Sequence, residues 1–268
     1  MAQFKTGHQI IQFEDSGTPG PAVIFNHSFG MNGAMFQPQL EAFAGTYRCV
    51  TWDERGHGGT LANGPFTFWD SAEDCLKLLD HLGIQKAIFV GTSQGGFIAL
   101  RTALLAPQRV QALAILGSSA AEEDPARKIQ YQQLHDAFVG PAGHQEPVLD
   151  MMATLCFGAG FDAEPWKSQW RQWPTEQFTL AFQTLVERDS VLARLHEIKA
   201  PTLVMHGSAD GSFDPSHGEA IADGVGNGAG FVLVDNGAHF LNLTDPAPVN
   251  QALKRFLADN APRATTAA

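Results

Sequence analysis

The fold of this 268-residue chain can be predicted from the stretch VGTSQGGF at residues 90–97. Ser93 stands there between Gly91 and Gly95, after the apolar run KAIFV and before the helix-like run FIALRTALLA. A strand that turns directly into a helix holds the residue at the turn in a strained backbone conformation, with its side chain projecting above the sheet. Side chains at the flanking positions would collide, and Gly96 lets the helix lie close to the strand. The stretch therefore predicts a serine raised above the edge of a sheet, at the N-terminus of a helix.

Short apolar runs alternate with helix-like segments along the rest of the chain. Strands covered on both faces are expected, because the runs are nearly continuous in apolar residues; they lie at 22–26, 47–52, 86–91, 110–117, 201–207 and 230–235. Apolar residues at helical spacing separate them, at Phe36, Leu40 and Phe43, at Ala72, Cys75, Leu76 and Leu79, and at Val249, Leu253, Phe256 and Leu257. The alternation predicts an α/β fold, with a mostly parallel central sheet flanked by helices.

One segment lacks this alternation. Residues 118–195 contain no clear strand, several helix-like pieces and a crowd of aromatic residues. We therefore expect a core formed by residues 1–117 and 196–268, with an inserted helical cap at 118–195.

The aromatic residues of the cap permit two interpretations. Trp166 and Trp170 are four residues apart and share one face of a helix. That face either docks the cap onto the core or forms an apolar roof over a substrate pocket. For the second interpretation the candidate pocket residues are Trp166, Trp170 and Phe157.

Composition excludes several classes of partner. The net charge of -11, from 17 basic and 28 acidic residues, provides no positive field for nucleic acid or for anionic membrane surfaces. No window reaches the roughly 18 to 20 apolar residues of a membrane span, and the first residues lack a signal-peptide pattern, so we expect a cytoplasmic protein. The oligomeric state stays open.

No metal or cofactor is expected. The cysteines are Cys49, Cys75 and Cys156, an odd number at wide spacing, and we interpret all three as small core residues. No HExxH-like spacing indicates a metal site, and the glycines of residues 91–96 do not form a dinucleotide-binding loop.

A serine nucleophile needs a base, and the base needs an orienting carboxylate. Asp210 follows the predicted strand PTLVMHG, and His239 follows the predicted strand GFVLVD. Both lie past the carboxyl ends of strands, at the sheet edge that carries Ser93, where parallel sheets bind ligands. Asp214 is the alternative acid, but Asp210 follows its strand more directly.

The chain resembles the α/β-hydrolase family through five motifs: FNHSFG (25–30), DERGHG (53–58), GTSQGG (91–96), HGSAD (206–210) and GAHF (237–240). The resemblance implies a Ser93, Asp210 and His239 triad, and an oxyanion hole formed by the backbone N–H groups of Phe29 and Gln94. The HSFG sequence is similar to the enol-lactonase and esterase branch, although serine replaces its usual glycine.

Other polar residues near these motifs are expected to be structural. We expect Asp53, Arg55 and His57 to form an ion pair or hydrogen-bond network, His206 to be packed, and His27 to anchor the oxyanion loop by hydrogen bonds.

The expected function is that of a serine hydrolase which cleaves a small or medium, mostly apolar ester or lactone through an acyl-enzyme. Carbon–carbon bond hydrolases and cofactor-free haloperoxidases or perhydrolases keep the same triad, so they remain alternatives. Perhydrolases usually carry tryptophan where this chain has Phe29. A non-catalytic ligand receptor on the same fold is a further alternative.

Overall fold

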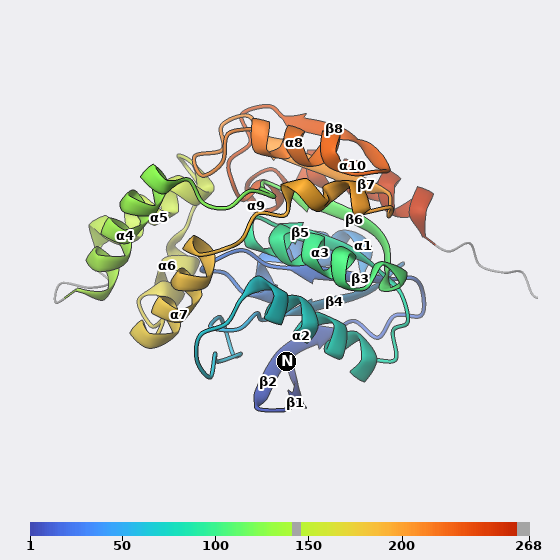
Figure 1. Cartoon of the computed structure of the whole chain (residues 1–268), viewed down its shortest axis with the longest axis horizontal. Helices are drawn as coiled ribbons and strands as arrows, with labels where there is room; N and C mark the ends of the chain where they lie inside the picture. Colours follow the sequence, from blue (N-terminus) through green and yellow to red (C-terminus); the bar gives the residue numbers. More distant parts are fainter. Residues whose placement is uncertain (141–145, 262–268) are drawn as a thin grey trace, which may run out of the picture.

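The computed structural model describes residues 1–140 and 146–261 (Figure 1). Their centre is an eight-stranded sheet in the order β1-β2-β4-β3-β5-β6-β7-β8, in which β2 pairs antiparallel with both β1 and β4, and all other neighbouring strands are parallel. The strands are β1 (Ala2–Thr6), β2 (Gln9–Asp15), β3 (Ala22–Asn26), β4 (Arg48–Trp52), β5 (Ala87–Thr92), β6 (Val110–Leu116), β7 (Thr202–Gly207) and β8 (Gly228–Val234). The predicted mostly parallel α/β sheet is confirmed.

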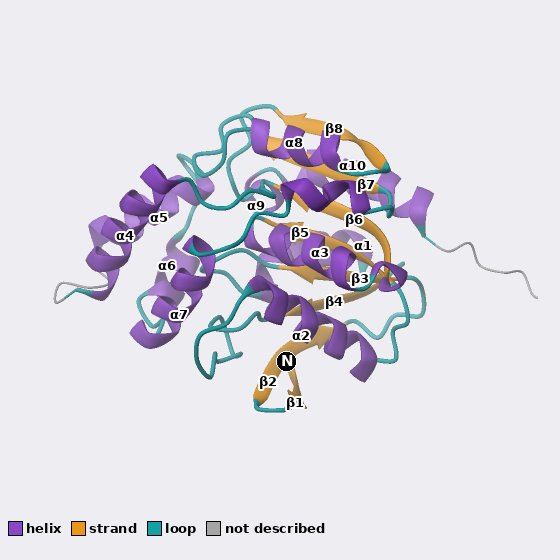
Figure 2. Ribbon diagram, viewed as in Figure 1, coloured by secondary structure: helices purple, strands orange, loops and turns teal. Residues whose placement is uncertain are grey.

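Helices cover both faces of the sheet (Figure 2). They are α1 (Gln37–Phe43), α2 (Phe68–His81), α3 (Gln94–Leu105), α8 (Ser216–Gly224), α9 (Leu241–Thr244) and α10 (Pro246–Asn260), with short 3-10 turns η1 (Gly33–Phe36) and η2 (Pro107–Arg109). Alternate residues of β3 face opposite layers. Val23 and Phe25 join the core with α1 and α10, whereas Ile24 joins the core with α2, α3 and α8. Continuous apolar runs form such strands because both faces are buried.

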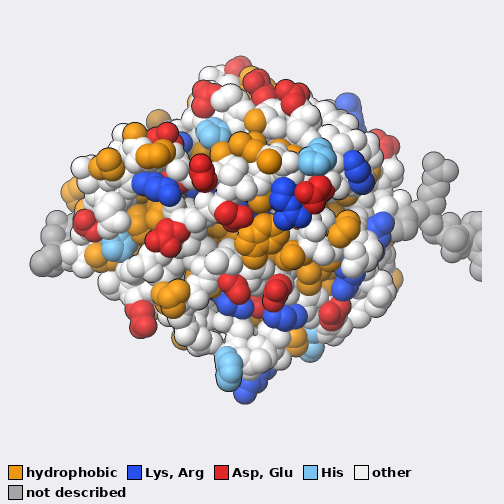
Figure 3. Space-filling view, viewed as in Figure 1, with side chains coloured by type: hydrophobic (Ala, Val, Ile, Leu, Met, Phe, Trp, Pro, Cys, Tyr) orange, Lys and Arg blue, Asp and Glu red, His pale blue; other side chains and the backbone are white. Residues whose placement is uncertain are grey.

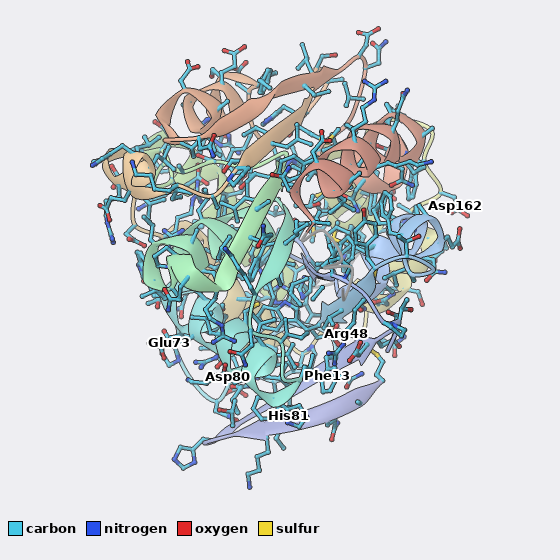
Figure 4. The ribbon with its side chains drawn as sticks, turned by 90° about the vertical axis from the view of Figure 1, so that its right-hand side faces the viewer. Phe13, Arg48, Glu73, Asp80, His81 and Asp162 are labelled. Carbon is cyan, nitrogen blue, oxygen red and sulfur yellow. The ribbon has the colours of Figure 1, made fainter. Side chains whose placement is uncertain are left out.

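The N-terminal hairpin of β1 and β2 was not among the predicted strands. β2 is buried only at alternate positions, a weaker signal than a continuous apolar run. The hairpin packs against the end of α2. The ring of His81 stacks on that of Phe4, with ring centroids 4.3 Å apart. It also meets the ring of Phe13 edge-on, with centroids 5.9 Å apart (Figure 4). An ion pair of 2.7 Å between Arg48 and Asp15 joins β4 to the end of β2.

The segment between β6 and β7 contains residues 118–195 and is called the cap segment below. Its described residues are mostly helical. It contains α4 (Pro125–Val139), α5 (Glu146–Phe157), α6 (Glu164–Trp170), α7 (Thr175–Val186) and the turn η3 (Leu192–Glu197). Figure 1 shows α4 to α7 gathered at one end of the sheet. Because the segment leaves the carboxyl end of β6, it lies beside the loops that follow β3 and β5.

The surface carries mixed charge on the face that Figure 3 shows, with acidic and basic side chains side by side rather than in one basic patch. Among the described residues, no helix is long and apolar enough to cross a membrane.

Candidate active site

Ser93 occupies the tight turn between β5 and α3. Its φ of 52° lies in the left-handed region, which is strained for a residue other than glycine. A Cβ on Gly91 would overlap the backbone of Gly95, and one on Gly95 would overlap the carbonyl of Asn26 in β3. A Cβ on Gly96 would press on the end of β6. The sequence prediction that these glycines permit the turn is confirmed.

His239 and Asp210 meet at the same edge of the sheet. Asp210 Oδ2 and His239 Nδ1 are 2.8 Å apart, and both residues are buried or nearly so. Asp214, the alternative acid, instead accepts a hydrogen bond from the backbone N–H of Ser216 at 3.0 Å. Burial raises the pKa of the Asp210 carboxyl, but His239 and His206 outweigh it and hold that pKa well below its usual range. The carboxylate is therefore ionised and able to orient an imidazole.

A second set of hydrogen bonds fixes the Asp210 carboxylate. Oδ1 accepts from the backbone N–H groups of Ser212 at 2.7 Å and Phe213 at 2.9 Å. Oδ2 also lies 3.1 Å from His206 Nε2, and that nitrogen lies 3.0 Å from the carbonyl oxygen of Phe213. His206 is packed, as predicted, but its contact with Asp210 was missed. The spacing of four residues across the turn after β7 was the only available signal.

Ser93 and His239 line one cavity of about 60 Å³ beneath the helices of the cap segment. Because Asp210 engages Nδ1 of His239, Nε2 is the ring nitrogen left to act on a serine hydroxyl. No hydrogen bond joins the Ser93 hydroxyl to His239 among the described residues; such bonds often tighten only when substrate is bound. The other lining residues are Ser28, Phe29, Tyr131, Leu134, Met152, Leu155, Cys156, Trp170, Phe178, Phe182, Leu185, Ser212, Phe213 and Phe240.

The three candidate pocket aromatics have different positions. Trp170 lines the cavity, whereas Trp166 and Phe157 do not. Both are buried in the adjacent core, where Phe157 stacks on Trp170 with ring centroids 6.2 Å apart. Phe157 ends α5 and Trp166 lies on α6, and both belong to the same buried apolar cluster as Trp170.

One cysteine differs from its predicted role. Cys49 and Cys75 are buried core residues, as expected. Cys156 lines the cavity instead, because the C-terminal turn of α5 faces the loop that carries His239. Burial, together with the charge of Asp210, raises the pKa of its thiol to about 12, so the thiol stays protonated.

The two segments expected to form the oxyanion hole are linked by a chain of hydrogen bonds. Gln94 is the first residue of α3, where backbone N–H groups favour negative charge, and Phe29 lies in the loop after β3. The Gln94 side chain donates to Glu54 Oε2 at 2.5 Å, and the backbone N–H of Glu54 donates to His27 Nε2 at 2.8 Å. His27 Nδ1 in turn lies 2.8 Å from the carbonyl oxygen of Ser28. The prediction that His27 anchors this loop is confirmed.

The pKa shifts of Glu54 and His27 both favour the neutral form of the side chain. Burial raises the pKa of Glu54 well above its usual value, and the nearby Asp53 adds to the rise, although the bond from Gln94 opposes it. Burial also lowers the pKa of His27 to about 4. Glu54 Oε1 has no hydrogen-bond partner among the described residues. The link between the two loops is therefore a buried network in which both titratable side chains favour the neutral form.

Tryptophans attach the cap segment to the loops that follow β3 and β4. Trp170 Nε1 donates to the carbonyl oxygen of Gly30 at 2.6 Å, and Trp173 Nε1 donates to that of Gly56 at 2.8 Å. Trp170 thus both docks the segment and lines the cavity, so the two interpretations of the aromatic face hold together.

The charged turn after β4 is structural, as predicted. Arg55 forms an ion pair with Asp74, and the carboxylate of Asp53 accepts backbone N–H bonds from the loops around it. Burial lowers the pKa of His57 to about 3, and its Nδ1 lies 2.9 Å from the carbonyl oxygen of Arg55. None of these side chains lines the cavity with Ser93. Within the described residues, no group of three or more His, Cys, Asp or Glu side chains is placed to hold a metal ion.

This combination of fold and strand-to-helix serine turn defines an α/β hydrolase. A sequence model of the α/β hydrolase fold matches residues 21–246, and the chain belongs to that family. The family and its relatives support hydrolase activity.

The chain is similar to 3-oxoadipate enol-lactonase 1 of Acinetobacter baylyi, with 30% identity over 88% of each chain. It is also 30% identical to a Mycobacterium tuberculosis protein provisionally named a non-heme bromoperoxidase, over 92% of this chain and 97% of that one. The crystal structure of a hydrolase from Pseudomonas aeruginosa superposes with a TM-score of 0.84 at 28% identity, covering 96% of this chain and 97% of the other.

Proposed function

We propose that the protein is a serine hydrolase that cleaves small or medium, mostly apolar carboxylic esters or lactones. The observation that carries the proposal is the Asp210–His239 hydrogen bond of 2.8 Å beside the cavity that Ser93 lines. The enol-lactonase relative adds support for a lactone or a related ester.

In the proposed reaction, His239 Nε2 takes the proton of the Ser93 hydroxyl as its oxygen attacks the acyl carbonyl. Asp210 holds the imidazole in the tautomer that carries a proton on Nδ1. The backbone N–H groups of Phe29 and Gln94 receive the oxyanion, and each such donor contributes about 10²- to 10³-fold in rate. His239 then protonates the departing alcohol. Water, activated by His239, releases the acid from Ser93.

The cavity favours a short acyl group. Its volume of about 60 Å³ is small, and the lining is mostly aromatic and aliphatic. We therefore expect acetyl and butyryl esters to be cleaved faster than long-chain esters, since a long chain requires the cap segment to move.

The test is a Ser93→Ala variant assayed on p-nitrophenyl acetate, p-nitrophenyl butyrate and a simple lactone. We expect a loss of about 10⁴-fold or more in kcat, because the remaining residues cannot form the acyl-enzyme. Ser168→Ala is the matched control, because Ser168 is exposed on α6. A Ser93→Ala variant as active as its parent would remove the proposal.

A bromoperoxidase or perhydrolase activity is the second candidate, and the relative named for it is the supporting observation. Bromination of monochlorodimedone in acetate, peroxide and bromide distinguishes it from ester hydrolysis. Adding a vinylogous diketone to the substrate panel tests the carbon–carbon bond hydrolase alternative in the same way.

A further inference from the structure

Most of the cavity wall is apolar, so its few polar side chains indicate where a polar group of a substrate could bind. Apart from Ser93 and His239, they are Ser28, Ser212, Cys156 and Tyr131. Ser28 and Ser212 belong to the loops that carry the oxyanion segment and Asp210. Cys156 and Tyr131 come instead from α5 and α4 of the cap segment, and Tyr131 is the one of the two that brings a hydroxyl group to the cavity wall.

The Tyr131 hydroxyl is held by Arg127, one helical turn earlier. Arg127 Nη2 donates to Tyr131 Oη, and the guanidinium carbon lies 5.2 Å from the centre of the tyrosine ring. An oxygen that accepts this bond keeps its own proton for donation. Among the described residues no acceptor receives that proton. Burial raises the pKa of the phenol, which keeps the group a donor.

Positive charge gathers behind this part of the wall. Arg127 lies 3.4 Å from Glu123, and Arg188 lies 2.8 Å from the same carboxylate. Both guanidinium groups also stack on Phe213, at 5.2 and 5.6 Å from its ring centre, and Phe213 lines the cavity. Two cations share one anion, so the cluster has an excess positive charge in a chain whose net charge is -11. That field favours an electron-rich group near Tyr131.

We propose that Tyr131 is a specificity-determining residue, whose hydroxyl donates a hydrogen bond to a second oxygen of the substrate, a keto or carboxylate oxygen remote from the scissile carbonyl. The inference rests on the proposed ester or lactone hydrolysis in the same cavity. It narrows the substrate class from apolar esters to oxo-acyl or dicarboxylic monoesters and the corresponding lactones. An aliphatic substrate would leave the phenol proton unpaired in a buried site, which is unfavourable.

The test compares esters that differ by one acceptor group. p-Nitrophenyl acetoacetate is paired with the butyrate, and p-nitrophenyl levulinate with the valerate, so that the keto oxygen takes two positions. p-Nitrophenyl hydrogen glutarate, also paired with the valerate, provides a carboxylate. Rates measured with Ser93→Ala are subtracted, because these esters also hydrolyse without enzyme. Comparing the rates for the keto esters with the rate for the glutarate shows whether the site prefers a keto oxygen or a carboxylate oxygen.

Tyr131→Phe removes one oxygen and keeps the ring. We expect it to lower the ratio of kcat/KM for the preferred keto ester to kcat/KM for the matching unsubstituted ester by about three- to tenfold, or the corresponding ratio for the glutarate by about tenfold to a hundredfold. Arg127→Met is expected to reduce the same preference, with no further loss in the double variant. Tyr47→Phe is the matched control, because Tyr47 does not line the cavity.

The outcomes separate the two proposals. If the parent enzyme hydrolyses no ester faster than Ser93→Ala does, the proposed function fails, and the inference fails with it. If the esters are hydrolysed but the parent enzyme cleaves the keto and glutarate esters no better than the matching unsubstituted esters, the inference alone is overturned. The same holds if Tyr131→Phe keeps the preference of the parent enzyme for the keto or glutarate ester.

Discussion

Replacing Gly95 by alanine tests the physical link between the serine turn and the oxyanion segment. The added Cβ would overlap the carbonyl of Asn26 and lie 2.8 Å from the carbonyl oxygen of His27. All of these obstructing atoms belong to the backbone at the end of β3, so no side chain can rotate to relieve the overlap. Either the first turn of α3 or the loop that carries Phe29 must shift.

The size of the effect follows from that geometry. The added Cβ would lie 1.9 Å from the Asn26 carbonyl oxygen, and an ordinary contact begins at 3.4 Å, so the two segments must separate by about 1.5 Å. A misplacement of even about 1 Å can cost about 10²-fold in rate. Loss of one oxyanion donor would cost about 10²- to 10³-fold. Forcing an extra methyl group into a packed core destabilises a protein by about 1–3 kcal/mol. We therefore expect Gly95→Ala to lower kcat by about 10²-fold and the free energy of unfolding by about 1–3 kcal/mol.

Two measurements check this expectation. Urea unfolding followed by far-UV circular dichroism gives the change in stability, and hydrolysis of p-nitrophenyl butyrate gives kcat for the fraction that remains folded. Gly45→Ala is the control, because a Cβ there meets nothing within 4 Å and the backbone is not left-handed. Its stability should stay within about 0.5 kcal/mol of the parent. A Gly95→Ala variant with the parent's kcat and stability would refute this account of the turn.

Three other changes have defined outcomes. Asp210→Asn should lower kcat by about 10³- to 10⁴-fold at pH 7 with an intact fold, because the amide no longer holds His239 in the required tautomer; retention of kcat would contradict the role of the 2.8 Å bond. Trp170→Phe leaves the carbonyl of Gly30 without its donor, and should lower the free energy of unfolding by about 1–3 kcal/mol and reduce kcat, both measurable in the assays above. Glu54→Gln tests how the free energy of unfolding depends on pH. Because the folded-state pKa of Glu54 is raised, the stability that its neutral carboxyl contributes is fully present below the ordinary pKa of 4.5 and is lost as pH rises through the folded-state pKa. Urea unfolding from pH 4 to 9 should show the variant gaining stability relative to the parent as pH rises, and a constant difference would contradict a neutral buried carboxyl.

Much of the fold could be predicted from local patterns. The six continuous apolar runs became β3 to β8, with ends displaced by at most two residues. The β1–β2 hairpin was missed because β2 is only half-buried, so its pattern is short and its pairing partner lies elsewhere. In the cap segment the sequence analysis predicted helix-like pieces without their bounds, because the apolar faces of these helices pack on one another.

The sequence placed Ser93, Asp210 and His239 at one sheet edge, because each follows the end of a parallel strand and such ends meet on the same side. The role of the glycines at residues 91–96 could also be predicted from the sequence, since a tight turn excludes side chains for local steric reasons.

Contacts between distant segments could not be read in this way. The bonds from Gln94 to Glu54 and from Trp170 to Gly30 depend on how loops and helices pack after the sheet has formed. Strand positions follow from patterns of a few residues, which the chain carries locally. The lining of the cavity depends on side-chain packing between distant segments, as in the bond from Trp170 to Gly30, which are 140 residues apart, and only the assembled molecule determines which segments meet.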